Sequence, residues 1–144
     1  MKKRSKRMSK VVAVAQSEER RVCLEMGRAQ QAVDADVERL QELEAYRHSY
    51  SREFTFTGNV SSQRWQDYQN FLRRIDDAVA AQKEQVLTGQ QNRDAHRRRW
   101  MRTRQRVESL ERVVDRYREV EDREDARQQQ KSLDDLAARP RMRR

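Results

Sequence analysis

Apolar residues recur at alternating steps of three and four along two long stretches of the chain. The first stretch runs from Val12 to Phe54 and the second from Trp65 to Tyr117, and neither loses its phase. This spacing places the apolar side chains on one narrow stripe of a helix, the seam that a coiled coil buries. The pattern therefore predicts two long amphipathic helices.

The segment between the two stretches interrupts the helical pattern. It reads TFTGNVSS and contains Gly58 and Asn59, which favour a turn, while Ser61 suits the N-cap of a following helix. A short connection makes consecutive helices antiparallel neighbours. We therefore expect an all-α fold, a long two-helix antiparallel coiled-coil hairpin forming a single elongated domain over residues 1–144. The expected parts are helix one at about 8–54, a loop at 55–61, helix two at about 62–135 and a basic tail at 136–144.

The register of the hairpin follows from its apex. An apex at Thr57 and Gly58 predicts that Met26 faces Gly89, so that a large side chain lies against a small one. A shift by one heptad is the alternative, with less complementary pairs. The first register also gives the pairs Ala15 with Trp100 and Glu19 with His96, and it places residues 1–10 beside residues 105–114.

Composition agrees with helices that bury only a seam. Charged residues make up 40% of the 144 positions and aromatic residues 6%, with three glycines and one proline. A compact globule would need more apolar side chains and more turn formers. No run of 18 apolar residues occurs, so we expect no transmembrane span. Cys23 is single, which favours a cytoplasmic location over a disulfide-forming compartment.

The net charge of +9 is concentrated at the two ends of the chain. Residues 1–10 carry six basic side chains and no acidic one, and residues 139–144 carry four arginines and no acidic one. The residues between them are nearly balanced. Helix two is expected to overhang its partner from about residue 115, so both basic tips would lie at one end of the hairpin.

The stretch HRRRWMRTRQR, residues 96–106, resembles a nucleic-acid-binding arm at first sight. In the heptad phase, however, its arginines lie off the seam, while His96, Trp100 and Thr103 lie on it. Only four apolar seam positions follow, too few for the zipper of a basic leucine-zipper protein. We interpret the stretch as a solvated helix face, partly neutralised by acids of helix one. The candidate acids are Glu18, Glu19 and Glu25.

Motifs of catalysis are missing from the sequence. It contains no glycine-rich phosphate loop, no paired cysteines and no nucleophile elbow. His48 and His96 lack the spacing of a metal site, and Cys23 reads as a small side chain beside the seam. We therefore expect a non-enzyme with no catalytic residue, no metal and no cofactor.

An ordered set of side chains lies on both sides of the expected turn. Its members are Leu43, Tyr46, Arg47, Tyr50, Trp65, Tyr68, Phe71, Leu72, Ile75, Ala78 and Gln82. Together with the downstream Trp100 and the segment VESLERVVDRY, this set resembles the FliJ family of bacterial flagellar export proteins over about residues 12–138. The resemblance implies a fold similar to the central stalk subunit of rotary ATPases.

The resemblance also implies a role as a soluble component of the flagellar type III export apparatus. Its implied partners are the export ATPase hexamer, the cytoplasmic domain of the membrane export gate and export chaperones, with peripheral association at the cytoplasmic face of the membrane. No specific nucleic acid is expected. The alternatives are the equivalent stalk of a virulence secretion system, and a generic structural or nucleic-acid-associated coiled coil.

Two candidate binding sites follow. Tyr46 and Phe71 flank the seam, so they would form an exposed apolar patch, and the resemblance places export-gate binding on this stripe. The expected gate site comprises Leu43, Tyr46, Tyr50, Phe71, Ile75, Ala78 and Gln82. The expected contact with the ATPase ring comprises the basic ends, Lys2, Lys3, Arg4, Lys6, Arg7, Arg139, Arg141, Arg143 and Arg144.

Overall fold

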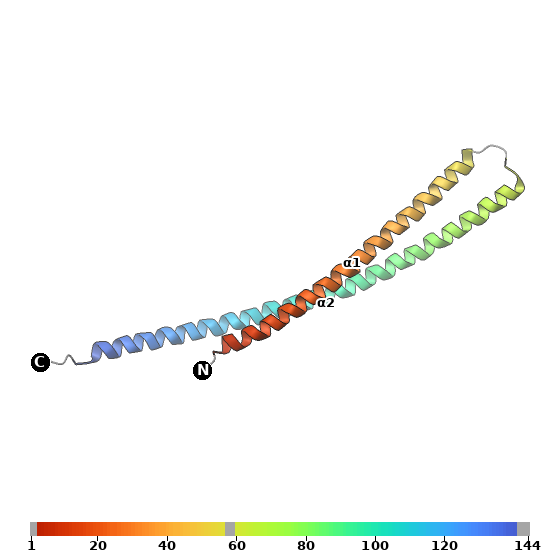
Figure 1. Cartoon of the computed structure of the whole chain (residues 1–144). Helices are drawn as coiled ribbons and strands as arrows, with labels where there is room; N and C mark the ends of the chain where they lie inside the picture. The colour runs from red at the N-terminus through yellow and green to blue at the C-terminus, as the bar shows by residue number, and fades with distance from the viewer. Residues whose placement is uncertain (1–2, 57–59, 141–144) are drawn as a thin grey trace. The chain divides into compact units, whose positions relative to one another are not determined.

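A computed structural model describes residues 3–56 and 60–140 of the chain. Helix α1 spans Arg4–Phe56 and helix α2 spans Ser62–Ala138 (Figure 1). Between residues 3 and 140, the described part contains no strand. The prediction of an all-α hairpin of two long helices is confirmed.

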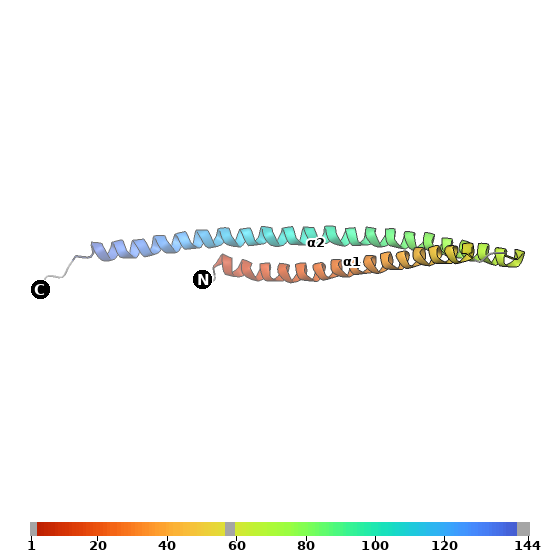
Figure 2. The ribbon, with the colours of Figure 1, turned by 90° about the horizontal axis from the view of Figure 1, so that it is seen from above.

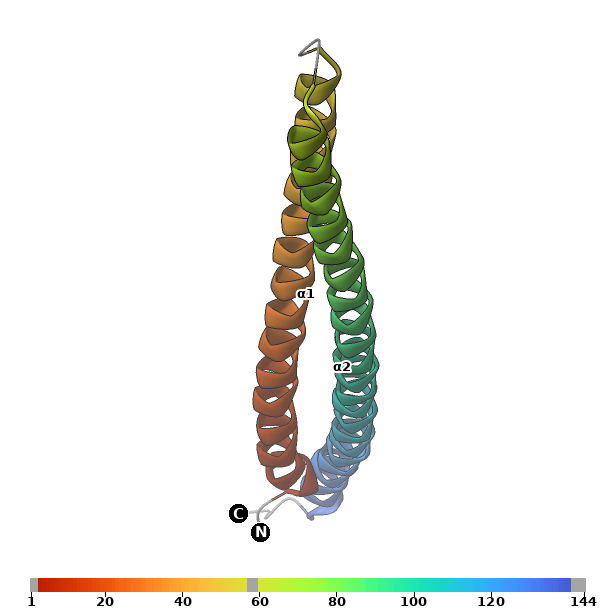
Figure 3. The ribbon, with the colours of Figure 1, turned by 90° about the vertical axis from the view of Figure 1, so that its right-hand side faces the viewer.

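The chain divides into two compact units, each built from part of α1 and part of α2. One unit comprises Met1–Arg21 and Met101–Arg144, and in it α2 continues beyond the start of α1 (Figure 2). The other comprises Val22–Trp100, and in it the two helices run side by side in opposite directions (Figures 1 and 3).

The predicted seam is the buried stripe of both helices. Val22 is fully buried, and the predicted seam position that is most open is Trp65, which is 51% exposed near the start of α2. Every buried apolar side chain of the described residues lies at a predicted seam position. These side chains are Val12, Ala15, Val22, Ala29, Val33, Tyr68, Ile75, Val86, Val107 and Val114.

The predicted register is wrong in the Val22–Trp100 unit. A Cβ added at Gly89 would lie 3.4 Å from Cγ2 of Val33 and 3.6 Å from Oδ2 of Asp36, so Gly89 faces Val33, one heptad from Met26. One reason is that α1 continues to Phe56, past its predicted end. Another is ring stacking near the turn, which the helical period alone does not reveal. The predicted apex at residues 57 and 58 lies outside the described residues.

The register prediction also fails in the other unit. Gln16 donates from Nε2 to Oε1 of Glu111 at 3.1 Å, and Ser5 bonds to Glu121. The start of α1 therefore lies beside residues 121–125 and not beside 105–114. The overhang of α2 consequently begins near Asp125, later than the expected residue 115, because polar pairs continue the seam beyond its last apolar positions.

Capping interactions explain where both helices begin. The N–H of Arg64 donates to Oγ of Ser61 at 3.2 Å, and the N–H of Trp65 donates to the carbonyl oxygen of Ser61 at 3.0 Å. This confirms the N-cap predicted for α2. At the start of α1, the N–H and Oγ of Ser5 donate to the two carboxylate oxygens of Glu121, at 3.1 and 2.5 Å. A side chain of α2 thus satisfies an N–H group that the first turn of α1 leaves unpaired.

Candidate interaction surfaces

Six aromatic rings form a continuous series between the two helices near the turn. Those of α1 follow one another at intervals of four residues and those of α2 at intervals of three, which keeps each set on one side of its helix. The closest pairs are Phe54 with Tyr68, whose ring centroids are 3.7 Å apart, and Tyr50 with Phe71, at 4.0 Å. We call this series the aromatic ladder. Its members are Tyr46, Tyr50, Phe54, Trp65, Tyr68 and Phe71.

Tyr46 is the outermost ring at the end of the ladder farther from the turn. It is 55% exposed, and its edge contacts Phe71 with centroids 5.7 Å apart and planes at 76°. Phe71 is half-buried and rests on Tyr50. The exposed ring of Tyr46 thus rests against Phe71, which itself packs on Tyr50, as expected for positions that flank the seam.

The other residues of the predicted gate site differ in their accessibility. Ala78 is exposed and Leu43 is half-buried, whereas Ile75 is buried. Gln82 is also buried, and its Nε2 donates to the backbone oxygen of Asp36 at 2.8 Å. The structure therefore brings Tyr46, Tyr50 and Phe71 into one cluster and directs Gln82 toward α1.

Three members of the ladder are absent from the predicted site. Phe54, Trp65 and Tyr68 were placed on the seam and not in the gate site, yet they stack in series with Tyr50. Their signal in the sequence is the density of aromatic residues on both sides of the turn. Recognising it as one cluster requires the register, because spacing within one helix cannot say which rings meet across the seam.

An ion pair crosses between the helices beside the ladder. Nε of Arg47 bonds to Oδ1 of Asp76, and Nη2 of Arg47 lies 3.5 Å from Oδ2. The hydrogen bond and charge of Asp76 raise the pKa of Arg47 above its ordinary value. Both side chains are about half exposed, so the pair adds little stability and mainly aligns the two helices.

The predicted ATPase contact is only partly described, because Lys2, Arg141, Arg143 and Arg144 lie outside the described residues. Arg4, Lys6, Arg7 and Arg139 are exposed. Lys3 is exposed as well, but its Nζ lies 2.6 Å from Oδ2 of Asp125. That hydrogen bond and the charge of Asp125 raise the pKa of Lys3. Acidic residues of α2 thus neutralise part of the basic N-terminal end.

The described basic residues of the two ends lie apart within their unit. Helix α2 runs on past the start of α1 before it ends at Ala138, so it carries Arg139 away from the N-terminal basic residues (Figure 2). The overhang of α2, which the sequence predicts, therefore separates Arg139 from the basic residues at the start of α1.

The arginine-rich stretch lies on the helix surface, as predicted. His96, Trp100 and Thr103 are half-buried, and the six arginines are less buried. Arg99 lies 3.4 Å from Glu25 of α1, whereas Arg104 lies 3.5 Å from Glu108 of its own helix. Glu18 pairs with Arg21 at 2.5 Å. The ion pair of Arg99 with Glu25 is one of the neutralising contacts that the sequence predicts.

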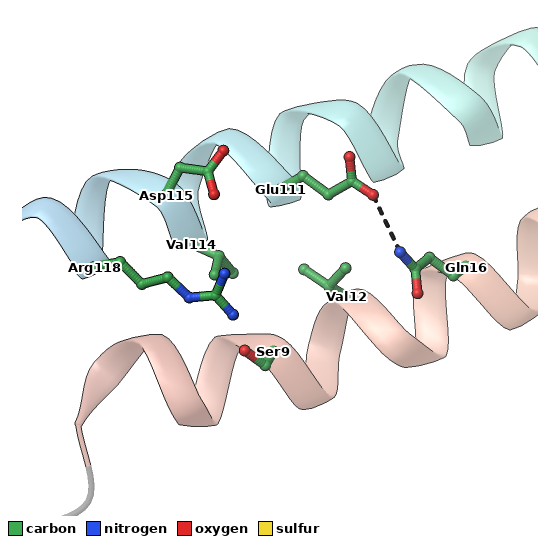
Figure 4. Close-up of a pocket in the computed structure, with 7 residues that line it drawn as sticks. All are labelled: Ser9, Val12, Gln16, Glu111, Val114, Asp115 and Arg118. Carbon is green, nitrogen blue, oxygen red and sulfur yellow. Dashed lines mark hydrogen bonds between the residues drawn. The ribbon is translucent and has the colours of Figure 1, made fainter.

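A small hollow of about 340 Å³ lies between α1 and α2 in the unit that contains both ends of the chain. In Figure 4 the side chain of Arg118 extends toward α1, and Gln16 bonds to Glu111 across the hollow. Acidic, basic and apolar groups alternate around it without a convergent set of ligands. Its lining comprises Ser9, Val12, Gln16, Glu111, Val114, Asp115 and Arg118.

The described residues contain neither a cluster of metal ligands nor a stretch that could cross a membrane. Within residues 3–56 and 60–140, no three histidine, cysteine or acidic side chains lie together as metal ligands would. Neither helix, over its described length, has a stretch apolar enough to cross a bilayer.

Comparison with known proteins gives one family. The family model described as "Flagellar FliJ protein" matches residues 4–144. The Flagellar FliJ protein of Salmonella typhi is 28% identical over 109 residues, which cover 74% of each chain. No solved structure matches.

Proposed function

The chain belongs to the flagellar FliJ family, components of flagellar protein export, and we propose that the end of its aromatic ladder formed by Tyr46, Phe71 and Tyr50 binds the cytoplasmic domain of the membrane export gate. One observation carries this proposal, namely that the exposed ring of Tyr46 contacts Phe71, which in turn packs on Tyr50. The flagellar family match favours this system over the virulence-secretion alternative.

A contact surface that is already ordered lowers the entropy cost of binding. Aromatic side chains dominate the binding energy of protein interfaces when they are held in place before the partner arrives. The ring beneath Tyr46 restricts its rotamers, and the ion pair of Arg47 with Asp76 aligns the two helices beside it. Binding would therefore cost this chain little conformational entropy, because mainly the partner would become ordered. Ile75 and Gln82, which are buried, support the surface from within.

The test is Tyr46→Ala, alone and together with Phe71→Ala, in the full chain. We expect each variant to remain helical and the double variant to lose about 2 kcal/mol of binding free energy for the gate domain, as for an interface hot spot. Isothermal titration calorimetry measures the affinity, and circular dichroism follows the fold.

Trp65→Ala is the matched control. Trp65 is 51% exposed and belongs to the same ladder, but it lies near the start of α2, away from Tyr46. Its truncation should leave gate binding nearly unchanged. Equal losses for Trp65→Ala and Tyr46→Ala, or normal binding by a less stable Tyr46 variant, would reject the site.

The basic residues at the start of α1 form the second part of the proposal, as a contact with the export ATPase ring. Arg4, Lys6 and Arg7 are exposed there, and Arg139 is exposed just after α2. If these charges act directly, stimulation of the ATPase should weaken as salt rises. Stimulation that survives glutamine substitution of all four would reject this contact. Delivery of chaperones and peripheral association with the membrane would follow from the two contacts.

A further inference from the structure

Acidic residues of α2 hold the basic start of α1. Nζ of Lys3 lies 2.6 Å from Oδ2 of Asp125, and Glu121 accepts hydrogen bonds from both the N–H and the Oγ of Ser5. These four residues lie in the unit that contains both ends of the chain. Building on the ATPase contact proposed above, we propose that their contacts form an autoinhibitory clasp, which competes with the ATPase ring for the basic start of α1.

The clasp places acidic side chains where an acidic partner would have to bind. A groove of about 800 Å³ between the start of α1 and residues 117–128 of α2 has bases on one side and acids on the other. A ring surface that binds these bases needs acidic groups of its own, and the carboxylates of α2 would repel them. The segment EVEDRED, residues 119–125, thus supplies the charge that the ring would otherwise supply. The bases that line the groove are Lys3, Arg4 and Arg7, and the acids are Glu121, Glu124 and Asp125.

Lys3 is the basic residue that the clasp engages most directly. The hydrogen bond and charge of Asp125 raise the pKa of Lys3, and the charges of Glu121 and Asp122 act in the same direction. The carbonyl oxygen of Lys3 also accepts the N–H of Arg7 at 3.3 Å, which joins Lys3 to the first turn of α1. A partner can therefore use the charge of Lys3 only after Asp125 has released it.

The clasp is weak enough for a partner to open. The side chains of Lys3 and Asp125 are 51% and 50% exposed, and ion pairs at such exposure contribute little stability, because water and salt screen them. An acidic surface on the ring can therefore displace Asp125. Removing the carboxylate should consequently change the apparent affinity for the ring by a small factor and not by orders of magnitude.

The experiment measures how the full chain stimulates the export ATPase as its concentration rises. Asp125→Asn releases Lys3, so we expect half-maximal stimulation at about threefold lower concentration of the chain. The matched control is Glu108→Gln, which removes the same charge from an exposed residue of α2 that pairs with Arg104 of its own helix. The control should leave the half-maximal concentration unchanged. Circular dichroism verifies that each variant keeps its helicity.

Lysine substitutions show whether Asp125 acts through Lys3. Lys6 is the matched comparison, because it is exposed at the same end of α1. In the wild-type chain, Lys3→Gln should raise the half-maximal concentration less than Lys6→Gln does, because Asp125 already holds Lys3. In the Asp125→Asn chain the two substitutions should have about equal effects. The gain from Asp125→Asn should also vanish when Lys3→Gln is present, since residues in contact are coupled.

Two outcomes would overturn the clasp. The first is unchanged or weaker stimulation by Asp125→Asn, since the acids of α2 then do not compete with the ring. The second is an equal gain from Glu108→Gln, or a gain from Asp125→Asn that persists with Lys3→Gln, because net charge alone then explains it. A different result, stimulation that ignores the loss of every base at the start of α1, would reject the ATPase contact itself and with it the regulatory role of the clasp.

Discussion

Replacing Gly89 tests the packing of the seam most directly. A glycine within a helix costs roughly 1 kcal/mol relative to alanine, because it loses more backbone freedom on folding. The chain has two described glycines within helices, Gly27 and Gly89, and they differ in their surroundings. A Cβ at Gly27 would meet nothing within 4 Å, whereas a Cβ at Gly89 would lie 3.4 Å from Val33 and 3.6 Å from Asp36.

The distances set the expected magnitudes. Gly27→Ala should stabilise the fold by about 1 kcal/mol through helix propensity alone. Gly89→Ala gains the same propensity, and its methyl group reaches van der Waals contact with Val33 without overlap, so it should also stabilise by about 1 kcal/mol. Gly89→Leu places further atoms where Val33 already lies and should cost about 1–3 kcal/mol by overpacking.

The assay is urea-induced unfolding followed by circular dichroism, with Gly27→Leu as the matched control for the larger side chain. Pairing Gly89→Leu with Val33→Ala should recover part of the lost stability, because the smaller side chain makes room. The coupling between the two sites should be about 0.5–3 kcal/mol, as for residues in contact. Met26→Ala should give no such recovery.

Two results would refute this reasoning. Gly89→Ala could destabilise the fold while Gly27→Ala stabilises it. In that case the two helices lie closer together at Gly89 than the distance of 3.4 Å to Val33 indicates. If Met26→Ala relieves Gly89→Leu and Val33→Ala does not, the helices pair one heptad away and the observed register is wrong.

Two further predictions concern the helix ends. The Ser5 side-chain hydrogen bond holds the pKa of Glu121 below its usual 4.5, so its stabilisation of the first turn of α1 is present above that value and lost as pH falls through the lowered folded pKa. An NMR titration of the Ser5 amide should show a midpoint below 4.5 that is absent in Glu121→Gln, and a midpoint at or above 4.5 would contradict the contact. Ser61→Ala should cost about 1 kcal/mol in urea unfolding because Arg64 loses its cap, whereas Ser62→Ala should be nearly neutral, and equal costs would deny Ser61 that role.

The sequence by itself determined which side chains face inward. Helical period is a local property, so the spacing of Val22, Ile75 and Val107 identifies the buried side of each helix without knowledge of the partner. The cap at Ser61 is equally local, because it needs only an oxygen three residues before a free N–H group. The positions of Tyr46 and Phe71 beside the seam followed from the same phase.

Only the tertiary structure decided which of those side chains meet. A shift by one heptad keeps every seam residue on the seam and changes only its partner, so the periodicity is compatible with both registers. Contacts between residues distant in the chain distinguish them, such as Gly89 against Val33 and Phe54 stacked on Tyr68. The aromatic ladder, the pairing of Lys3 with Asp125 and the uncovered end of α2 all depend on that choice, and for this reason the sequence alone could not reveal them.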